Sequence, residues 1–445
     1  MEKRVFFDDN VLLHTPTAVK LYKGVATLPI VDYHSHLSEK DIEEDKTFST
    51  ITEFWLAGDH YKWRAMRSCG IDEKYVTGDA TDYEKFFAYA SVMPKLIGNP
   101  LFYWTHMELK RIFGINVPLN ADTAPTIYAQ ANEKLKSLSV RKLLALFSVQ
   151  YIATTDDPVS SLQSHGTYDG VKVCPTFRAD KALKLEENYL EELGAAFGKP
   201  ICNLEDFETA LEARLKHFIS KGCTIADVSV EDIPDCDVSQ EEAGNLFLRR
   251  TELTPAEKHR FYSYGMSYLA ALYQKYEICW QLHIGALRNI NTPMFNKLGA
   301  DSGYDVMQGY IDTNAIAAFL NALYRAGKLP KIILYTLNTA ALPTLCTIAA
   351  SFPNVRMGAA WWFNDTLLGI RHHLDTVAEY SALGTSLGML TDSRSFSSYC
   401  RFDFFRRIIS DYVAEKVDAG EYDEKDAKQI LYDVCYANPK QFMNL

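Results

Sequence analysis

Two histidines separated by one residue follow a short apolar run near the N-terminus. The run Leu28–Tyr33 is typical of a buried strand, and His34 and His36 come directly after it. Side chains two residues apart on an extended chain point to the same side, so both imidazoles can bind one divalent metal ion. A pair of surface or hydrogen-bonded histidines would show the same spacing. The position at the end of a strand favours the metal site.

An aspartate and an arginine follow another apolar run near the C-terminus. Gly388–Thr391 is followed by Asp392 and, two residues later, Arg394. Asp392 could complete a His-His-Asp metal site if the last strand of a closed sheet lies beside the first. Arg394 could then orient Asp392 or bind an anionic substrate. A local Asp–Arg pair that caps the next helix is the alternative.

Further polar or aromatic residues follow other apolar runs. Arg178 comes after Val171–Pro175, and a guanidinium group suits a carboxylate ligand, although a structural salt bridge would also explain it. Trp361 and Trp362 could form the wall of a sugar pocket or simply pack in the core. A histidine, His283, lies at the end of a fifth run.

Eight apolar runs of this kind are spread along the chain. Their lengths suit buried parallel strands, and eight is the strand number of a (β/α)₈ barrel. Catalytic groups of such barrels lie at the carboxyl ends of the strands, which is where these polar residues fall. The runs are Leu28–Tyr33, Val149–Ala153, Val171–Pro175, Cys223–Val228, Cys279–Ile284, Lys331–Tyr335, Arg356–Ala360 and Gly388–Thr391.

Helical patterns separate the later runs and predict regular strand–helix alternation. The earlier part is less regular, and we expect helical insertions at about 40–145, 181–220 and 238–275, packed on the barrel. We therefore predict an α/β fold in which residues 1–445 form a single catalytic domain. The helices expected in the second half are Thr313–Ala326, Asn338–Ser351, Asp365–Leu383 and Phe396–Asp418.

The composition excludes several classes of protein. Lys and Arg number 46 and Asp and Glu 57, so the net charge is −11, which argues against a nucleic-acid partner. No apolar stretch approaches the roughly 20 residues of a membrane span, so we expect no membrane partner. Nine cysteines without a CxxC motif favour a reducing compartment and predict a cytoplasmic protein. A homo-oligomer is compatible with these features.

Several segments, in this order, resemble the uronate (glucuronate) isomerases of the amidohydrolase superfamily. The combination is specific and extends over nearly the whole chain. The segments are DYHSHL (32–37), WLAGDHYKWRAMRSCG (55–70), IGNPLFYWTHMELKRIFGI (97–115), TTDDP (154–158), HIGALRN (283–289), WWFND (361–365) and GMLTDSRSF (388–396).

The resemblance implies a distorted (β/α)₈ barrel that interconverts an aldose and a ketose. The expected reactions are D-glucuronate to D-fructuronate and D-galacturonate to D-tagaturonate, by proton transfer through an enediol. It also implies one divalent metal ion, usually zinc. The residues that match the metal ligands of the family are His34, His36 and Asp392.

The resemblance also assigns roles around the substrate. Arg178 matches the residue that contacts the substrate carboxylate, although the surrounding TFRAD (176–180) replaces the SWRPD of many members. His60 and Tyr61 match an active-site His-Tyr pair, and Arg394 matches the arginine beside the metal-binding aspartate. We expect Asp392, His60 and Tyr61 to transfer protons in an order that the sequence leaves open. Further substrate contacts are expected from His283, Trp361 and Trp362.

Two other functions fit part of this pattern. A mononuclear metal-dependent hydrolase of the same superfamily could use His34, His36, His283 and Asp392 to activate water. A sugar-acid binding protein would need the arginine and the tryptophans but not the metal set. A binuclear site is not expected, because the fourth run lacks a bridging lysine and the sixth a histidine.

Overall fold

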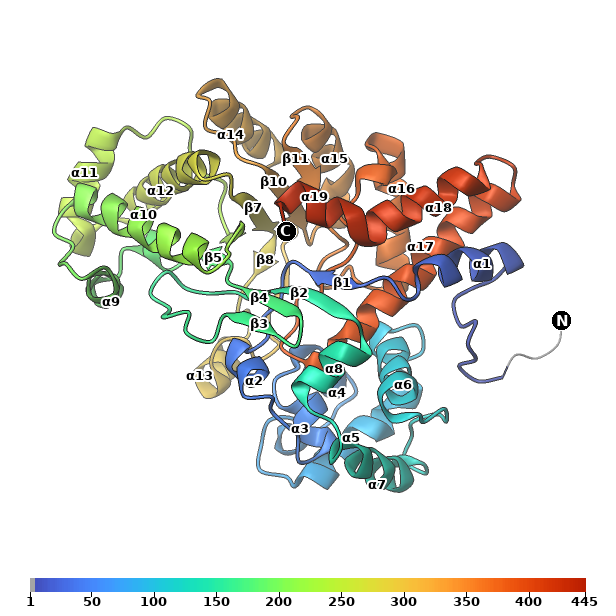
Figure 1. The fold of residues 1–445 in the computed structure, drawn as a ribbon. Coiled ribbons are helices and arrows are strands. Elements are labelled where there is room, and N and C mark those ends of the chain that lie inside the picture. The colour runs from blue at the N-terminus through green and yellow to red at the C-terminus, as the bar shows by residue number, and fades with distance from the viewer. Residues whose placement is uncertain (1–4) are drawn as a thin grey trace.

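The barrel strands are parallel and lie in two hydrogen-bonded sheets. The computed structural model describes residues 5–445 (Figure 1). One sheet has the order β1-β2-β4-β3, in which β3 (Gly166–Tyr168) is an antiparallel edge strand outside the barrel set, and the other has the order β5-β6-β7-β10-β11. The strands are β1 (Ile30–Asp32), β2 (Val149–Ala153), β4 (Val171–Cys174), β5 (Phe177–Arg178), β6 (Ile225–Val230), β7 (Cys279–Ile284), β10 (Ile332–Thr336) and β11 (Val355–Met357).

The third predicted strand, Val171–Pro175, corresponds to β4, and a separate short strand, β5, follows it in the other sheet. β4 pairs with β2, whereas β5 pairs with β6, and Pro175 and Thr176 lie between them. Proline has no N–H for a ladder, which suits the interruption. A single bridge between Asp156 and Phe177 still joins the two sheets, so the barrel continues across the break. The interruption places Arg178 at the end of β5, within the barrel wall.

The eighth predicted strand, Gly388–Thr391, is not a regular strand, so this part of the prediction is wrong. The Asp32 carboxylate instead accepts hydrogen bonds from the backbone N–H (2.9 Å) and hydroxyl (2.6 Å) of Thr391. The segment still lies beside β1, because the Asp392 N–H donates to the His34 carbonyl (3.1 Å). The last segment therefore closes the barrel against the first strand, mainly through a buried carboxylate.

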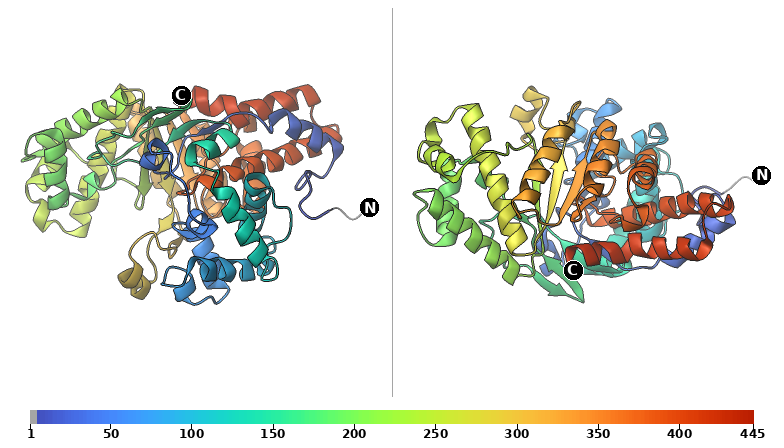
Figure 2. Two further views of the ribbon diagram at one scale, coloured as in Figure 1. Left: turned by 60° about the horizontal axis from the view of Figure 1, so that its bottom comes forward. Right: turned by 90° about the horizontal axis from the view of Figure 1, so that it is seen from above.

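Helices cover the outside of the barrel (Figures 1 and 2). The four predicted in the second half are confirmed to within a few residues, and two of them begin with a short 3₁₀ turn, at Thr339–Ala341 and Phe396–Tyr399. α17 (Cys400–Asp418) packs against α1 (Pro16–Val25), so two helices far apart in the sequence lie side by side. The four helices are α14 (Thr313–Arg325), α15 (Leu342–Ala350), α16 (Leu367–Tyr380) and α17 (Cys400–Asp418).

The three segments predicted as insertions are mainly helical. Residues 40–145 contain α2 (Glu39–Glu43), α3 (Ile51–Leu56), α4 (His60–Ser68), α5 (Asp82–Val92), α6 (Pro100–Phe113), α7 (Ala124–Leu135) and α8 (Val140–Leu146). The other two contain α9 (Glu187–Phe197), α10 (Leu204–Ser220), α11 (Gln240–Leu248) and α12 (Pro255–Lys275), which lie together on one side of the barrel in Figure 1. The remaining elements are β3 (Gly166–Tyr168), β8 (Ala286–Leu287), α13 (Thr292–Leu298), β9 (Val306–Met307), α18 (Glu424–Tyr432) and α19 (Asn438–Met443).

The interior of the barrel is filled by side chains from nearly every strand. This inner cluster includes Val31, Tyr151, Ile225, Cys279 and Ile333, all of them buried. A packed interior leaves space for a ligand only above the strands, at their carboxyl ends. In the part of the chain that the structure describes, no helix is long and apolar enough to cross a membrane.

Candidate active site

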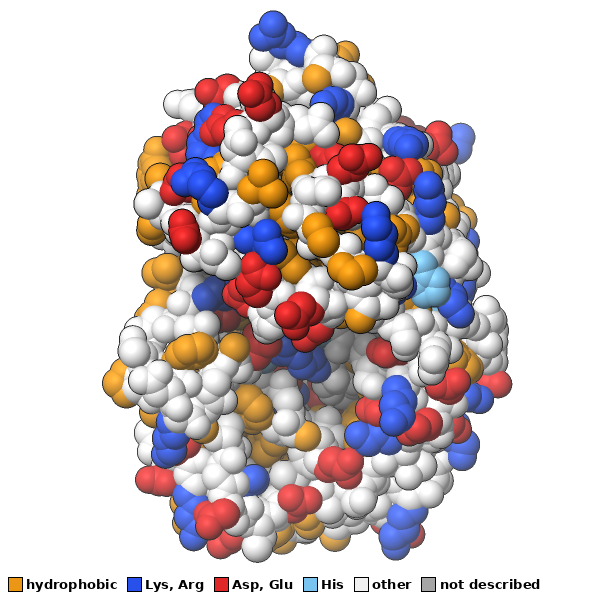
Figure 3. Space-filling view, turned by 90° about the vertical axis from the view of Figure 1, so that its left-hand side faces the viewer, with side chains coloured by type: hydrophobic (Ala, Val, Ile, Leu, Met, Phe, Trp, Pro, Cys, Tyr) orange, Lys and Arg blue, Asp and Glu red, His pale blue; other side chains and the backbone are white. Residues whose placement is uncertain are grey.

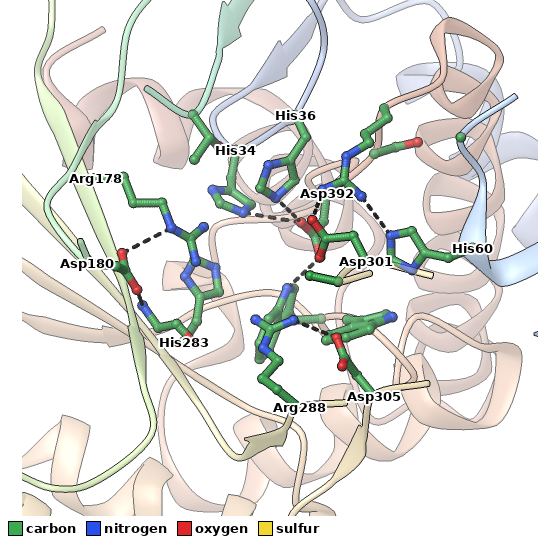
Figure 4. Close-up of a pocket in the computed structure, with 18 of the residues that line it drawn as sticks. His34, His36, His60, Arg178, Asp180, His283, Arg288, Asp301, Asp305 and Asp392 are labelled. Atoms are coloured by element: carbon green, nitrogen blue, oxygen red, sulfur yellow. Dashed lines mark hydrogen bonds and ion pairs between the residues drawn. The ribbon is translucent and has the colours of Figure 1, made fainter. Parts of the chain in front are cut away.

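An open pocket of about 550 Å³ lies at the carboxyl ends of the strands (Figure 4). Figure 3 shows a hollow on one face of the molecule, with acidic and basic side chains around it. All ten residues predicted for the site line this one pocket, although they come from widely separated parts of the chain. They are His34, His36, His60, Tyr61, Arg178, His283, Trp361, Trp362, Asp392 and Arg394.

The two histidines after β1 face the carboxylate of Asp392. The Nε2 atoms of His34 and His36 each lie 3.2 Å from its Oδ1 atom, and its Oδ2 atom accepts a hydrogen bond from the Trp361 indole N–H (2.7 Å). Burial alone would raise the pKa of Asp392, but hydrogen bonds from the two histidines hold it well below its usual value. Burial also lowers the pKa of His36 to about 4.

This arrangement fits a divalent metal ion. The ionised Asp392 and the neutral His36 are in the protonation states that a metal needs. Burial would lower the pKa of His34, but its contact with Asp392 raises it, so a metal ion would replace a proton there. Ligand atoms of the three residues lie within 4.8 Å of one another. His34 also forms a second group with Asp227 and His283. Because the Asp227 Oδ2 atom already pairs with the Arg178 guanidinium at 2.9 Å, the first group suits a cation better.

Arg178 lies between two carboxylates. Its Nε–H donates to Asp180 (3.0 Å) and one of its Nη1 hydrogens to Asp227 (2.9 Å), as Figure 4 shows in part. Burial would lower the pKa of Arg178, but Asp227 and Asp180 raise it above its ordinary value, so the group is permanently charged. The side chain is 22% exposed. These contacts fix its plane and leave Nη2 for a ligand in the pocket.

Asp227 also belongs to the site, although the sequence marked this position only by the lack of a bridging lysine. The carboxylate is fully buried at the centre of β6. It contacts Arg178 and lies 3.8 Å from Nδ1 of His283. Burial lowers the pKa of His283 well below its usual value, so this imidazole is neutral. A charged residue inside a strand that otherwise reads as apolar was the available signal.

His60 and Tyr61 form the first turn of α4. The Asp59 carboxylate caps this helix by accepting the backbone N–H groups of Tyr61 (3.0 Å) and Lys62 (3.2 Å). The residue pair therefore enters the pocket from a fixed helix end. Burial lowers the pKa of His60, and the nearby Arg394 lowers it further, so the imidazole is neutral.

Arg394 does not orient Asp392, in contrast to one of the roles considered for it. Its guanidinium donates to Nε2 of His60 (3.0 Å) and to Asp301 (2.9 Å). The bond to Asp301 connects Arg394 to the loop after α13. Trp361 holds Asp392 instead, through its indole N–H. The alternation of side chains predicted a shared side for Asp392 and Arg394, but Asp392 has a φ of +43°, which breaks that alternation.

The tryptophans form one wall of the pocket with a second arginine. Arg288 lies 5.2 Å above the Trp362 ring and pairs with Asp305 at 2.9 Å. Trp362 in turn stacks on Phe363 with ring centroids 4.5 Å apart. Both tryptophans line the pocket, as expected for a sugar wall. Arg288 is a further basic residue of the pocket that we did not single out from the sequence.

Known proteins resemble the chain over its full length. A family model for glucuronate isomerase matches residues 3–443. A uronate isomerase of Caldicellulosiruptor bescii is 43% identical, over 98% of this chain and 99% of the relative. The crystal structure of uronate isomerase from Thermotoga maritima superposes with a TM-score of 0.95 at 37% identity, over 99% of this chain and all of that one.

A second solved structure agrees at lower sequence similarity. Glucuronate isomerase from Caulobacter crescentus has a TM-score of 0.92 at 25% identity, with 98% of this chain and 97% of the other covered. Both structures share the overall fold of this chain. The matches extend through the barrel and through the helical segments between its strands. The chain therefore belongs to the glucuronate isomerase family.

Proposed function

We propose that the pocket isomerises hexuronates, D-glucuronate to D-fructuronate and D-galacturonate to D-tagaturonate. The observation that carries this proposal is the convergence of a fixed guanidinium, a His-His-Asp set and a His-Tyr pair in one pocket. A uronate has a carboxylate at one end and a reacting carbonyl at the other. The pocket provides a matching group for each end. Membership of the family favours this function over the hydrolase alternative.

Arg178 would bind the carboxylate at C6 of the open-chain sugar. Its orientation by Asp180 and Asp227 means that little side-chain entropy is lost when the substrate binds. Trp361, Trp362 and His283 would border the carbon chain. Binding at the far end would hold C1 and C2 close to the groups that transfer protons.

The reaction moves a proton from C2 to C1 and shifts the carbonyl in the opposite direction. Asp392, His60 and Tyr61 are the groups that we propose for the proton transfers. The ionised state of Asp392 suits it as a proton acceptor. A neutral His60 that accepts from Arg394 through Nε2 would carry its own proton on Nδ1 and could donate it. Arg394 would hold His60 with Nε2 as an acceptor and would contribute positive charge beside the enediol oxygens.

We also propose one divalent ion, zinc, on His34, His36 and Asp392. Such an ion polarises a carbonyl or hydroxyl oxygen and stabilises negative charge on it. Purified protein is expected to contain about one divalent ion per chain by elemental analysis. His36→Ala should lose the ion, whereas His60→Asn, the matched control at a residue that is not a proposed ligand, should retain it.

Two results would contradict this assignment of the metal. About two ions per chain would show that the group of His34, Asp227 and His283 is also a site. Retention of the ion by His36→Ala at the parental level would remove His36 from the ligands.

We propose that residues 1–445 form one catalytic domain in the cytoplasm. The absence of a disulfide among the nine cysteines supports a reducing compartment.

Product analysis tests the proposed function. The protein should convert D-glucuronate and D-galacturonate to the corresponding ketoses, identified by NMR, without cleavage of the carbon chain or release of an acyl product. A hydrolase of the same superfamily would give no ketose from either sugar. Absence of both ketoses from metal-loaded, folded protein would reject the proposal.

A further inference from the structure

Tyr61 is hydrogen-bonded to a buried carboxylate behind the pocket wall. Its hydroxyl donates to Oδ2 of Asp365 at 3.0 Å. Tyr61 lines the pocket from α4, whereas Asp365 comes from the loop between β11 and α16 and is not among the lining residues in the described part of the chain. The side chain of Asp365 is only 4% exposed. The phenol thus lies between the substrate space and a carboxylate that solvent does not reach.

A buried arginine completes this cluster. Arg401, on α17, lies 3.4 Å from the same Oδ2 atom of Asp365 and donates to the Thr391 carbonyl at 2.9 Å. Its guanidinium also lies over the Tyr61 ring, 4.9 Å from the centroid. It is 2% exposed, so its charge is compensated inside the protein. Arg401 links the Tyr61–Asp365 pair to the residue that precedes Asp392.

The protonation state of Tyr61 raises a chemical problem for its proposed role. Burial and the neighbouring Asp365 raise the pKa of Tyr61 well above its usual value, so the phenol is protonated at neutral pH. A protonated phenol has no capacity for a second proton. Tyr61 can accept a proton from C2 only if its own proton leaves at the same time, and that proton already points at Asp365.

We propose that Asp365 is a positioning residue that acts through Tyr61. It accepts the hydroxyl proton of Tyr61 while Tyr61 takes the proton from C2, and it later returns the hydroxyl proton to Tyr61. This inference rests on the proposed isomerase function. In the first step the C2–H bond breaks, its electron pair enters the enediolate, and Tyr61 remains a phenol while Asp365 becomes a carboxylic acid. The proton on the C2 oxygen then moves to the C1 oxygen, which shifts the negative charge of the enediolate to the C2 oxygen. In the second step Tyr61 protonates C1, the C2–O bond becomes the carbonyl, and Tyr61 recovers its hydroxyl proton from Asp365. No proton is gained or lost overall.

The electrostatics of Asp365 suit both halves of this exchange. Burial raises its pKa to about 6, against the lowering effect of Arg401 and of the Tyr61 hydrogen bond. Asp365 is therefore mostly ionised at neutral pH, yet its acid form is only slightly higher in free energy. The atom that would take the proton is Oδ2, which already accepts the Tyr61 hydroxyl, and the other oxygen, Oδ1, has no hydrogen-bond partner within residues 5–445.

A double-mutant cycle separates this role from a structural one. Asp365→Asn retains the size of the side chain and an acceptor for the Tyr61 hydroxyl, but an amide takes no proton. We expect kcat to fall roughly 100-fold, in the range for loss of general acid–base assistance. KM should change little, because Asp365 does not line the pocket. In a Tyr61→Phe background, Asp365→Asn should cause no further loss of kcat.

The opposite outcomes would overturn the inference. A parental kcat in Asp365→Asn would show that Asp365 holds no proton for Tyr61. An equal loss of kcat in both backgrounds would show that Asp365 acts only through the structure of the site. If Asp365→Asn does not fold, judged by thermal unfolding, Asp365→Glu retains the carboxylate and should keep most of kcat in the parent. If a folded Asp365→Glu variant has a kcat as low as that of Tyr61→Phe, Asp365 does not accept the Tyr61 proton. Lack of ketose formation by the parent protein would instead reject the isomerase function itself.

Discussion

Asp392→Asn should reduce kcat/KM for D-glucuronate by about 10³-fold or more, the scale for loss of a proton-transfer group together with a metal ligand. An amide is a poor metal ligand and no base, so both proposed roles of Asp392 end together. The bound ion should be lost in the same variant. Steady-state kinetics and elemental analysis of one preparation measure both effects.

The backbone at Asp392 makes asparagine a suitable replacement. The residue has a φ of +43°, and asparagine is one of the few residues that adopt this conformation readily. The amide oxygen can still accept the indole N–H of Trp361. We therefore expect thermal unfolding close to that of the metal-free parent. Turnover at the parental rate would exclude Asp392 from the chemistry. A large decrease in thermal stability would show that the loss of activity comes from damage to the fold.

Arg178→Met should weaken catalysis of hexuronates far more than any activity on an aldose without the acid group. A carboxylate in the pocket would lose its charged hydrogen-bond partner, an effect of about 3–4 kcal/mol. This corresponds to a decrease in kcat/KM of roughly 10²- to 10³-fold. The measurement is kcat/KM for D-glucuronate compared with D-glucose.

A second variant controls for the effect of Arg178 on the protein itself. Removing this arginine leaves Asp227 buried without its ion pair, which is destabilising by about 3–5 kcal/mol. Arg178→Met combined with Asp227→Asn removes that charge. The double variant should recover thermal stability but not uronate activity. Recovery of uronate activity in it would show that Arg178 compensates Asp227 rather than binding the substrate.

Sequence patterns predicted which side chains line the pocket, because the barrel fixes where strand ends lie. His34 and His36 follow a short apolar run, and any parallel barrel brings that strand end into the same layer as the others. His60 and Tyr61 follow no strand and were identified only through the resemblance. Their place in the pocket depends on the Asp59 cap and on how α4 packs.

The partners of each side chain could not be predicted in the same way. Arg394 contacts Asp301, which is 93 residues away in sequence, and Tyr61 contacts Asp365, which is 304 residues away. Such pairs depend on tertiary packing, and no local period encodes them. The irregular eighth strand has the same origin, since the Asp32 carboxylate replaces a backbone acceptor that a regular ladder would supply.

Conversion of D-glucuronate in D₂O, followed by NMR, tests the central claim most directly. If a side chain on one face of the enediol carries the proton from C2 to C1, the product should be fructuronate with partial deuterium at a single prochiral position of C1. Deuterium enters because the pocket is open to solvent, and its incorporation stays partial because some of the original proton is transferred directly. Ketose formed without any deuterium at any pH would indicate a hydride shift and contradict the account, as would the absence of ketose.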